Sequence, residues 1–568
     1  MAVPGLRWAA GYGAGVASAI FELCDEYVTR AAVLDPVWGT MRGVAGAPAG
    51  GTDFGPDGQA ARADLVRDTL RRLGQLEPST VDDRAAASHL AERLSVELEW
   101  HDTGESLRTV RAPFGPVSVI RDSVELVPHR DADGWAQLAE RLAAVPFMLG
   151  TWRAGVALGL ERGRPAARRQ ALETARQAER YSGSAGAAPT HAAIVESGPD
   201  GPLRTELAAA ADAAHAAYAE TARWLRAEYA PRAAEADGVG AERHALFRRM
   251  ILGADVDPVE AYEWAWAELH RIEDEISAEV ERIQPGATVD EAIAALDRTG
   301  SVDSTGAYRD WLQQRHDRAI EQLNGVHFDI AAPLRTVEVT LAPGSSAGAP
   351  YYTPPNEDFS RPGKTWWPLG DRTRFAVWSE LTTVFHEGVP GHHLQLGQAR
   401  LMGDRLSRYS RVSGVPGHSE GWALYAERLA DDLGWFAEPG QRFGMLKASA
   451  LRAARVVIDY GLHLDLPLPP AEAERHGPQW TFEVATEVLR DRGRIAPHRL
   501  HAEVVRYCGW PAQASAYKLG ERIWLAARDD ARQRAGASFD LKQWHTRALS
   551  LGPIGLGGLG AALRAADA

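Results

Sequence analysis

The sequence predicts a mainly helical protein with a short region of β-strand in its second half. Apolar residues recur at helical spacing near the N-terminus, as at Ile20, Leu23, Cys24 and Tyr27. Alanine, leucine, arginine and glutamate dominate long stretches, a composition that favours one large helical body over several small modules. Residues 336–341 instead alternate polar and apolar side chains, which is typical of a half-buried strand. We therefore expect an all-α architecture that carries one small edge sheet.

The best-marked helix in the chain begins after Asp257. Aspartate is a good N-cap, Pro258 suits the first helical position, and Glu260 can return a hydrogen bond to the cap. Apolar residues then continue every three or four positions as far as Ile283. We expect another helix to begin near Arg372, after a loop rich in proline, glycine and aromatic residues. This helix would lead directly into the segment with the strongest chemical signature.

The length of 568 residues would allow several domains. No internal repeat divides the chain, and we expect a single large catalytic unit over residues 1–568. Within it, residues 1–250 would form an N-terminal helical half, and residues 251–568 would form the half that carries the metal site.

Charge and cysteine content narrow the classes of partner and compartment. The formal net charge is −14, whereas proteins that bind nucleic acid present clustered lysine and arginine, so we expect no nucleic-acid partner. Cys24 and Cys508 are far apart in the sequence and belong to no paired motif, which fits buried thiols in a reducing compartment. No stretch approaches the roughly 20 apolar residues of a membrane span. We expect a cytoplasmic protein without a membrane partner.

Histidine and glutamate cluster in one part of the second half. Four of the 18 histidines fall between residues 386 and 418, in the segments HEGVPGHHLQ (386–395) and HSEGWALYAE (418–427). Imidazole and carboxylate groups are the usual ligands of a catalytic zinc ion, which takes three protein ligands and keeps one position open. The clustering therefore predicts a metal site.

The pattern departs from the familiar zinc-hydrolase motif His-Glu-x-x-His, because Pro390 stands where the second histidine should be. On an ideal helix, His386 and His392 would be roughly 9 Å apart along the axis, too far to share one ion. Pro390 cannot donate to the carbonyl of His386, and Gly391 accepts backbone angles that other residues resist. A local bulge could loop out two residues and return His392 to the place of the missing ligand, with His393 as the alternative.

Three carboxylates complete the expected site. Glu420 is our third ligand, near the start of a helix predicted over 419–430. Glu427, two turns further on the same face, could orient a ligand histidine by accepting its second N–H. Glu387 would act as the general base that takes a proton from the attacking water and later delivers it to the leaving amine. We expect one zinc ion per chain, although such ligands also accept manganese or cobalt.

These segments, together with RAARVVIDYGLH (452–463) and YKLG (517–520), resemble a large bacterial family catalogued as a domain of unknown function and placed in the zincin peptidase clan. The resemblance extends from about residue 14 to the C-terminus and is most specific in the second half. The family's fold is similar to that of the carboxypeptidase Taq metallocarboxypeptidases. The resemblance implies a large helical zincin-like (gluzincin) fold with a deep central groove, and a small edge sheet near the active-site helix.

The resemblance also suggests roles for residues around the metal. The segment HSE at 418–420 looks like a variant of the His-Glu-Ser segment that holds the third ligand in carboxypeptidase Taq enzymes, which supports Glu420. Their arginine-containing helix resembles RVVIDYGLH, in which Arg455 is the equivalent residue. Arg455 could hold a substrate carboxylate bidentately, and His463, two turns along the same face, could donate to the oxyanion. The alternative is an internally salt-bridged helix face.

Three tyrosines are further candidates. Tyr517, in a segment bounded by proline and glycine, could stabilise the oxyanion if its hydroxyl lies near the metal. Tyr351 and Tyr352 would bind substrate by shaping a cleft beside the strand at 336–341. Plain packing explains Tyr351 and Tyr352 equally well.

Together these residues favour a zinc-dependent metallopeptidase, either carboxypeptidase-like or an oligopeptidase, that hydrolyses a peptide or amide bond with metal-activated water. The same site could act on a non-peptide C–N bond, or the chain could be a non-catalytic helical protein that keeps a metal for structure. We expect the partner to be a small peptide or amide substrate, and we keep open whether the chain forms a homodimer.

Overall fold

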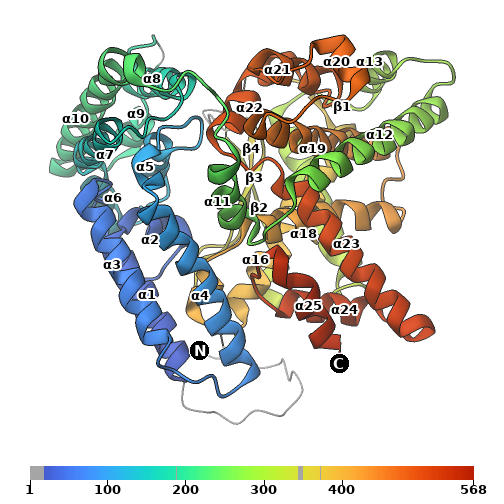
Figure 1. Cartoon of the computed structure of the whole chain (residues 1–568), viewed down its shortest axis with the longest axis horizontal. Helices are drawn as coiled ribbons and strands as arrows, with labels where there is room; N and C mark the ends of the chain where they lie inside the picture. The colour runs from blue at the N-terminus through green and yellow to red at the C-terminus, as the bar shows by residue number, and fades with distance from the viewer. Residues whose placement is uncertain (1–17, 187, 343–348, 371, 404, 568) are drawn as a thin grey trace.

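The computed structural model describes residues 18–186, 188–342, 349–370, 372–403 and 405–567. Over these ranges the chain is mainly helical and carries two small β-sheets, which confirms the predicted fold class (Figure 1). Residues 343–348, part of the predicted proline- and glycine-rich loop, lie outside the described residues.

Helices α1 to α10 build the N-terminal part of the chain. Their starts carry the expected signals, since Ser18 caps α1, Thr80 and Asp83 form a capping box at α4, and proline opens α2, α3, α5 and α10. Their bounds are α1 Ala19–Leu34, α2 Pro36–Arg42, α3 Pro56–Leu73, α4 Val81–Asp102, α5 Pro116–Glu125, α6 Ala132–Ala143, α7 Val145–Glu161, α8 Arg168–Ser182, α9 Ala192–Ser197 and α10 Pro202–Trp224.

Helices α11 to α25 build the rest of the chain. The helix predicted to begin after Asp257 is α12, with the Asp257 side chain accepting hydrogen bonds from its first turn. The bounds are α11 Ala241–Leu252, α12 Pro258–Ile283, α13 Val289–Thr299, α14 Thr305–Leu323, α15 Leu381–Glu387, α16 His392–Leu401, α17 Arg408–Val412, α18 Pro416–Asp432, α19 Gln441–Leu464, α20 Pro470–His476, α21 Phe482–Asp491, α22 Pro497–Gly509, α23 Ala516–Ala535, α24 Leu541–Ser550 and α25 Leu556–Asp567.

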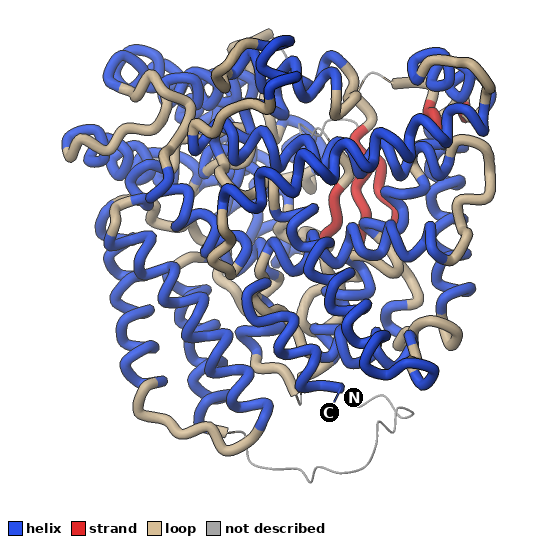
Figure 2. The backbone as a smooth tube through the Cα atoms, turned by 45° about the vertical axis from the view of Figure 1, so that its right-hand side comes forward, coloured by secondary structure: helices blue, strands red, loops and turns tan. Residues whose placement is uncertain are grey.

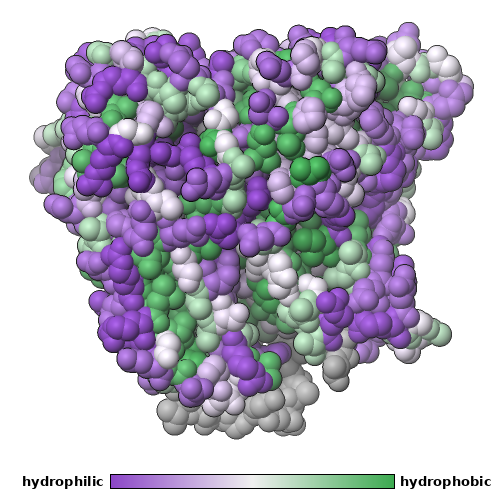
Figure 3. Space-filling model, in the orientation of Figure 1, coloured by the Kyte–Doolittle hydropathy of each residue, from purple (hydrophilic) through white to green (hydrophobic). Residues whose placement is uncertain are grey.

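Separate clusters of buried apolar side chains hold the parts together. One cluster, which includes Leu149 and Tyr218, packs α7 against α10. Another, which includes Leu23 and Leu94, reaches α17 through Tyr409, so that the N-terminal helices contact the second half of the chain. The largest cluster joins α12, α18, α19 and α23. The surface between the N-terminal part and the C-terminal helices is hollowed (Figure 3), in line with the expected groove.

The stretch Ala132–Glu161 is long and apolar enough to cross a membrane by length and composition alone, although the sequence was expected to contain no such stretch. Within its most apolar window, 44% is buried inside the protein. Met148, Trp152 and Val156 of α7 lie in the same core cluster as Leu149. The apolar character of this stretch is therefore partly that of a helix that packs against its neighbours.

A three-stranded sheet forms in the region where one strand was predicted. β2 (Glu338–Ala342) pairs in parallel with β4 (Lys364–Pro368), and β4 pairs antiparallel with β3 (Tyr351–Thr353). The strand predicted at 336–341 corresponds to β2. Figure 2 shows these strands as a short sheet enclosed among helices.

The helix expected from Arg372 begins only at Leu381, which corrects the prediction. Residues Phe375–Ala376 instead form β5, which pairs antiparallel with β1 (Ser301–Val302). The ring of Phe375 also stacks on Tyr308 with 4.2 Å between centroids. Because these partners lie far away in the sequence, local periodicity could not distinguish the short strand from the first turn of a helix.

Candidate metal centre

The segment HEGVPGHH folds as two helices joined by a turn. α15 ends at Glu387 and α16 begins at His392. The helix cannot continue normally at Pro390, whose nitrogen has no hydrogen to donate. As a result, the rings of His386 and His392 lie 4.8 Å apart between centroids, whereas an uninterrupted helix would separate these residues by roughly 9 Å along its axis.

Gly391 makes this turn possible. A Cβ atom at this position would overlap the carbonyl oxygen of His386 far inside van der Waals contact, so only glycine fits. The Gly391 N–H donates to the carbonyl of Phe385 at 3.0 Å and closes the turn. The indole N–H of Trp422 donates to the carbonyl of Pro390 at 2.8 Å, which fixes the turn against α18.

His386, His392 and Glu420 converge on one point. One ligand atom from each residue lies within 4.8 Å of the other two. Nε2 of both histidines is 3.5 Å from Oε2 of Glu420, and this buried oxygen has no hydrogen-bond partner. Tetrahedral zinc with bonds of about 2.0–2.1 Å separates its ligand atoms by about 3.3 Å. The three residues therefore fit a zinc ion in spacing and chemistry.

Glu427 contacts His386 as expected of a group that orients a metal ligand. The Nδ1–H of His386 donates to Oε1 of Glu427 at 2.8 Å, which leaves the lone pair of Nε2 to face Glu420 and His392. Glu427 is itself held by a hydrogen bond from the hydroxyl of Thr382 and lies 3.7 Å from Arg452.

The buried charges favour a cation among the three converging groups. Burial would lower the pKa of His386, but the carboxylates of Glu420 and Glu427 raise it to about 9. Burial would raise the pKa of Glu420, but the imidazoles of His386 and His392, each 3.5 Å from its carboxylate, hold this pKa well below its usual range. A positive charge is thus stabilised where the ligand atoms meet, and a divalent cation would supply it in place of a proton.

Glu387, the expected base, is buried beside the metal site. Its pKa is raised mainly by burial, while the positive charges of His386 and His392 oppose the rise. A carboxylate of this kind accepts a proton more readily than an exposed one. Its position at the end of α15 is compatible with the predicted role.

Two glycines bring Tyr517 toward the site. α18 and α23 cross so closely that a Cβ atom on Gly421 would lie 2.5 Å from the backbone of Gly520. The ring of Tyr517 consequently lies against His386, with 6.3 Å between centroids. Burial and the nearby charge of Glu420 raise the pKa of the Tyr517 hydroxyl, which therefore keeps its proton and can donate it in a hydrogen bond.

The structure brings His392, and not His393, together with His386 and Glu420. Nε2–H of His393 donates to the carbonyl of Leu334 at 3.0 Å, and its Nδ1 accepts from the hydroxyl of Tyr352 at 2.9 Å. Both nitrogens of His393 are therefore occupied. Tyr352 lies beside the site through this bond, whereas Tyr351, on the opposite face of β3, is exposed and stacks on Trp366.

Arg455 forms the internal salt bridge that was the alternative to substrate binding. Its guanidinium donates to Glu503 at 2.9 Å and to the hydroxyl of Tyr507 at 3.0 Å. Glu503 also accepts from Arg506 at 2.9 Å. Arg455 lies over the ring of Tyr517 at 5.1 Å, so its contacts position that tyrosine rather than leave a free fork for a carboxylate.

The expected oxyanion role of His463 does not fit the structure. Its Nε2–H donates to the carbonyl of Tyr507 at 3.0 Å, and its ring packs beside His244. Arg452, which reaches Glu427, precedes His463 by three turns of α19, or roughly 16 Å along the axis. Helical spacing correctly placed His463 on a buried face of α19. His463 lies at the end of this face that is distant from the candidate metal centre.

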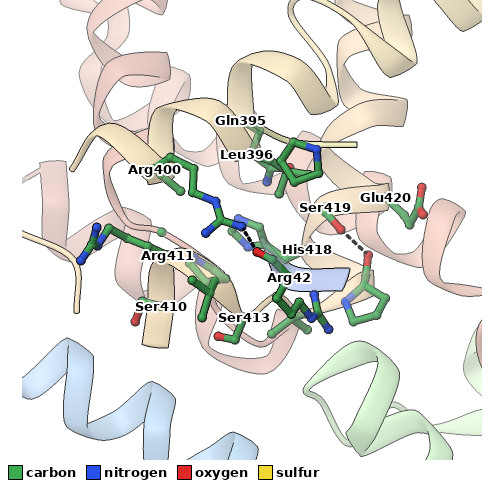
Figure 4. Close-up of a pocket in the computed structure, with 18 of the residues that line it drawn as sticks. Arg42, Gln395, Leu396, Arg400, Ser410, Arg411, Ser413, His418, Ser419 and Glu420 are labelled. Carbon is green, nitrogen blue, oxygen red and sulfur yellow. Dashed lines mark hydrogen bonds between the residues drawn. The ribbon is translucent and has the colours of Figure 1, made fainter. Parts of the chain in front are cut away.

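A cavity of about 310 Å³ opens beside the third ligand. Figure 4 shows Ser419 and Glu420 at one side of it and the arginines Arg400 and Arg411 at the other. Gln513, which donates to the Tyr517 hydroxyl at 3.4 Å, also lines the cavity. Of the three converging residues, Glu420 lines the cavity, whereas His386 and His392 do not.

A family match accompanies this geometry. The bacterial family described as "Bacterial protein of unknown function (DUF885)" matches residues 36–563. The chain belongs to this family. The match covers almost all of the described chain and includes every residue of the metal centre. No curated protein matches the chain in sequence.

Two solved structures share the fold of this family member. The "putative lipoprotein" from Colwellia psychrerythraea superposes with a TM-score of 0.79 at 19% identity, over 97% of this chain and 99% of that one. The "putative lipoprotein of unknown function" from Shewanella oneidensis gives a TM-score of 0.72 at 16% identity, over 96% of this chain and 100% of that one. Similarity at these identities shows the shared fold alone.

Sequence reasoning missed two groups that support the site. Thr382 lies four residues before His386 on α15, and this helical spacing could have revealed that both reach Glu427. His316 of α14 packs so closely on Gly388 that a Cβ atom there would overlap its ring. No local signal could have found His316, because it comes from a helix distant in the sequence.

Proposed function

We propose that this chain is a zinc-dependent hydrolase of the peptidase type that cleaves a peptide or amide bond. The observation that carries the proposal is the convergence of His386, His392 and Glu420 next to the buried carboxylate of Glu387. Zinc held by three protein ligands activates water at neutral pH and polarises a carbonyl group. A zincin-type peptidase assignment rests on this set of residues and on the motif resemblance.

The surrounding residues suit the remaining steps. Glu387 takes the proton of the attacking water and delivers it to the leaving nitrogen. The Tyr517 hydroxyl, which stays protonated, donates to the oxygen on which negative charge develops. Glu427 keeps His386 in the Nδ1–H form, so that Nε2 faces the other ligands. Tyr352 and Gln513 border the space next to these groups.

Metal content tests the ligand assignment. Purified wild-type chain, reconstituted with zinc and dialysed, should hold one zinc ion by mass spectrometry. His386→Ala should lose it, whereas Glu387→Gln should keep it because this residue is not a ligand. His501→Gln serves as the matched control, since His501 is exposed and pairs with Glu173 far along the sequence from the cluster. Absence of zinc from the reconstituted wild type would refute the proposed site.

Hydrolysis tests the reaction. A library of short peptides should be cleaved by the zinc-loaded wild type and not by Glu387→Gln, although both hold the metal. Cleavage retained in Glu387→Gln would exclude the general-base assignment. Zinc binding without cleavage of any peptide would instead favour a non-peptide C–N substrate or a structural metal.

The cellular location stays a prediction. The sequence favours the cytoplasm, whereas the two similar structures are named lipoproteins, which associates this fold with proteins outside the cytoplasm. We propose to resolve this by fractionating cells that express the tagged chain with its natural N-terminal region. Recovery in the membrane fraction would overturn the cytoplasmic assignment.

A further inference from the structure

The cavity beside Glu420 has an unusually basic wall. Arg42 at the end of α2, Arg400 on α16 and Arg411 on α17 all line it. The chain as a whole carries a formal net charge of −14, so this concentration of positive charge is local. Figure 4 shows Arg400 and Arg411 across the cavity from Glu420. The wall therefore carries positive charge, whereas the candidate metal centre is rich in negatively charged carboxylates.

These arginines lack acidic partners, although Arg400 is buried and Arg411 is half-buried. Among the described residues, none of the three forms an ion pair, whereas the adjacent Arg408 is paired with Glu357 at 2.9 Å. Nη1 of Arg400 and Nε of Arg411 are buried without a hydrogen-bond partner. Arg400 itself is only 6% exposed, and its other terminal nitrogen donates to the backbone carbonyl of Arg42 at 2.7 Å. Unpaired buried guanidinium groups are costly unless a ligand satisfies them.

The arginines also repel one another. Burial lowers the pKa of Arg400 to about 10, and the charges of Arg42, Arg411 and Arg361 add to this effect, while Glu357 offsets part of it. Neighbouring protein atoms lower the pKa of Arg42 as well, although part of its side chain is open to solvent. An anion bound among these groups would relieve their repulsion and pair their free N–H donors.

We propose that the wall formed by Arg42, Arg400 and Arg411 binds a carboxylate of the substrate, away from the bond that is cleaved. This inference rests on the proposed function, because it treats the cavity as the substrate site of the metal centre. It also assigns carboxylate recognition to these arginines instead of Arg455, whose guanidinium is occupied by Glu503 and Tyr507.

The separation of the wall from the metal centre sets the length of the substrate. Arg400 follows His392 by eight residues on the same helix, which places their backbones roughly 12 Å apart along the axis. An extended peptide advances about 3.3 Å per residue. A carboxylate at the arginine wall would therefore lie about three to four residues from the scissile bond. The favoured substrate class is a short acidic or carboxy-terminal peptide.

Peptide binding to the full-length Glu387→Gln chain tests this without turnover. The probes are acetyl-tetraalanine with a free carboxylate, the same peptide as its C-terminal amide, and acetyl-Ala-Ala-Ala-Glu-amide. Calorimetric titration is run on protein stripped of metal and on zinc-loaded protein. We expect the free-carboxylate peptide to bind about tenfold to a hundredfold more tightly than the amide, as expected for hydrogen bonds to charged groups. The glutamate probe distinguishes a carboxy-terminal carboxylate from a side-chain one.

Arginine variants locate the binding group. Arg42→Gln and Arg411→Gln are preferred to Arg400→Gln because neither side chain makes a hydrogen bond to other described residues. Each should abolish most of the difference between acid and amide. Arg405→Gln is the control, because this nearby arginine is mostly exposed and lies outside the cavity lining. A matching thermal unfolding midpoint shows that each variant is folded.

The outcomes separate this inference from the proposed function. Equal affinity of the Glu387→Gln chain for acid and amide, or a preference that survives both arginine substitutions, would overturn the carboxylate site. A wild type that fails to hold zinc would refute the metallohydrolase assignment. The peptide affinities of the arginine variants would still test the carboxylate site, because they are also measured on metal-free protein.

Discussion

Replacing Glu427 with glutamine should weaken zinc binding without unfolding the chain. In the wild type, Nδ1 of His386 lies 2.8 Å from the Glu427 carboxylate. Glutamine keeps the size of the side chain and an oxygen that accepts this hydrogen bond, but it removes the negative charge. A hydrogen bond to a charged group is worth about 1.5–3 kcal/mol and a neutral one about 0.5–1.5 kcal/mol. The difference of about 1–1.5 kcal/mol corresponds to about tenfold in affinity, the lower end of the range for partners of metal ligands.

Chelator competition would measure this loss. Zinc is titrated into wild-type, Glu427→Gln and Glu279→Gln chains in the presence of a chromogenic chelator, and the dissociation constants are compared. Glu279 is the matched control, because it is also buried but pairs with Arg282 on α12, outside the metal centre. Thermal unfolding of the metal-free proteins shows whether either substitution disturbs the fold. An affinity of Glu427→Gln within twofold of wild type would refute the orienting role.

Three further predictions concern the turn, the second ligand and buried histidines. Gly391→Ala should lose zinc and unfold at lower temperature, because its Cβ would overlap a backbone carbonyl, whereas Gly414→Ala, with open space around its Cβ, should do neither. His392→Ala should lose zinc, whereas His393→Ala should keep it and lose about 1–3 kcal/mol of stability through its unpaired partners; equal zinc loss in both would contradict the ligand choice. Burial lowers the pKa of His463 to about 4, against about 6.5 in the unfolded chain, so the unfolded chain binds more protons between these values. The contribution of His463 to the free energy of unfolding should be steady above pH 6.5 and fall by about 1.4 kcal/mol per pH unit as the pH drops toward 4. Denaturant unfolding from pH 8 to pH 4.5 checks this, and His463→Gln should show a shallower fall.

More residues of the candidate metal centre than of its surroundings could be predicted from the sequence. His386, Glu387 and His392 lie within one short segment, and Glu420 and Glu427 lie within another, so their residue types and spacing were visible along the chain. Pro390 and Gly391 indicated that the helix must break between the histidines, and the break occurs there.

Errors arose where the partner of a residue is distant in the sequence. Phe375 belongs to a two-residue strand whose pairing with β1 supplies its only regular structure, so it resembled the first turn of a helix. Helical spacing placed Arg455 and His463 on one buried face, but that face meets Glu503 and Tyr507 of α22 rather than open space. A periodic pattern identifies a buried face without identifying what covers it.

The sequence by itself determined the helical class, the starts of helices such as α12, and the identity of the groups that converge at the candidate metal centre. These follow from local preferences and from short-range spacing, which act within a few residues. Only the tertiary structure decided that His392 rather than His393 faces Glu420, because the competing bonds of His393 come from Leu334 and Tyr352. It also assembled the basic wall from α2, α16 and α17, since burial and charge depend on segments that meet only when the chain folds.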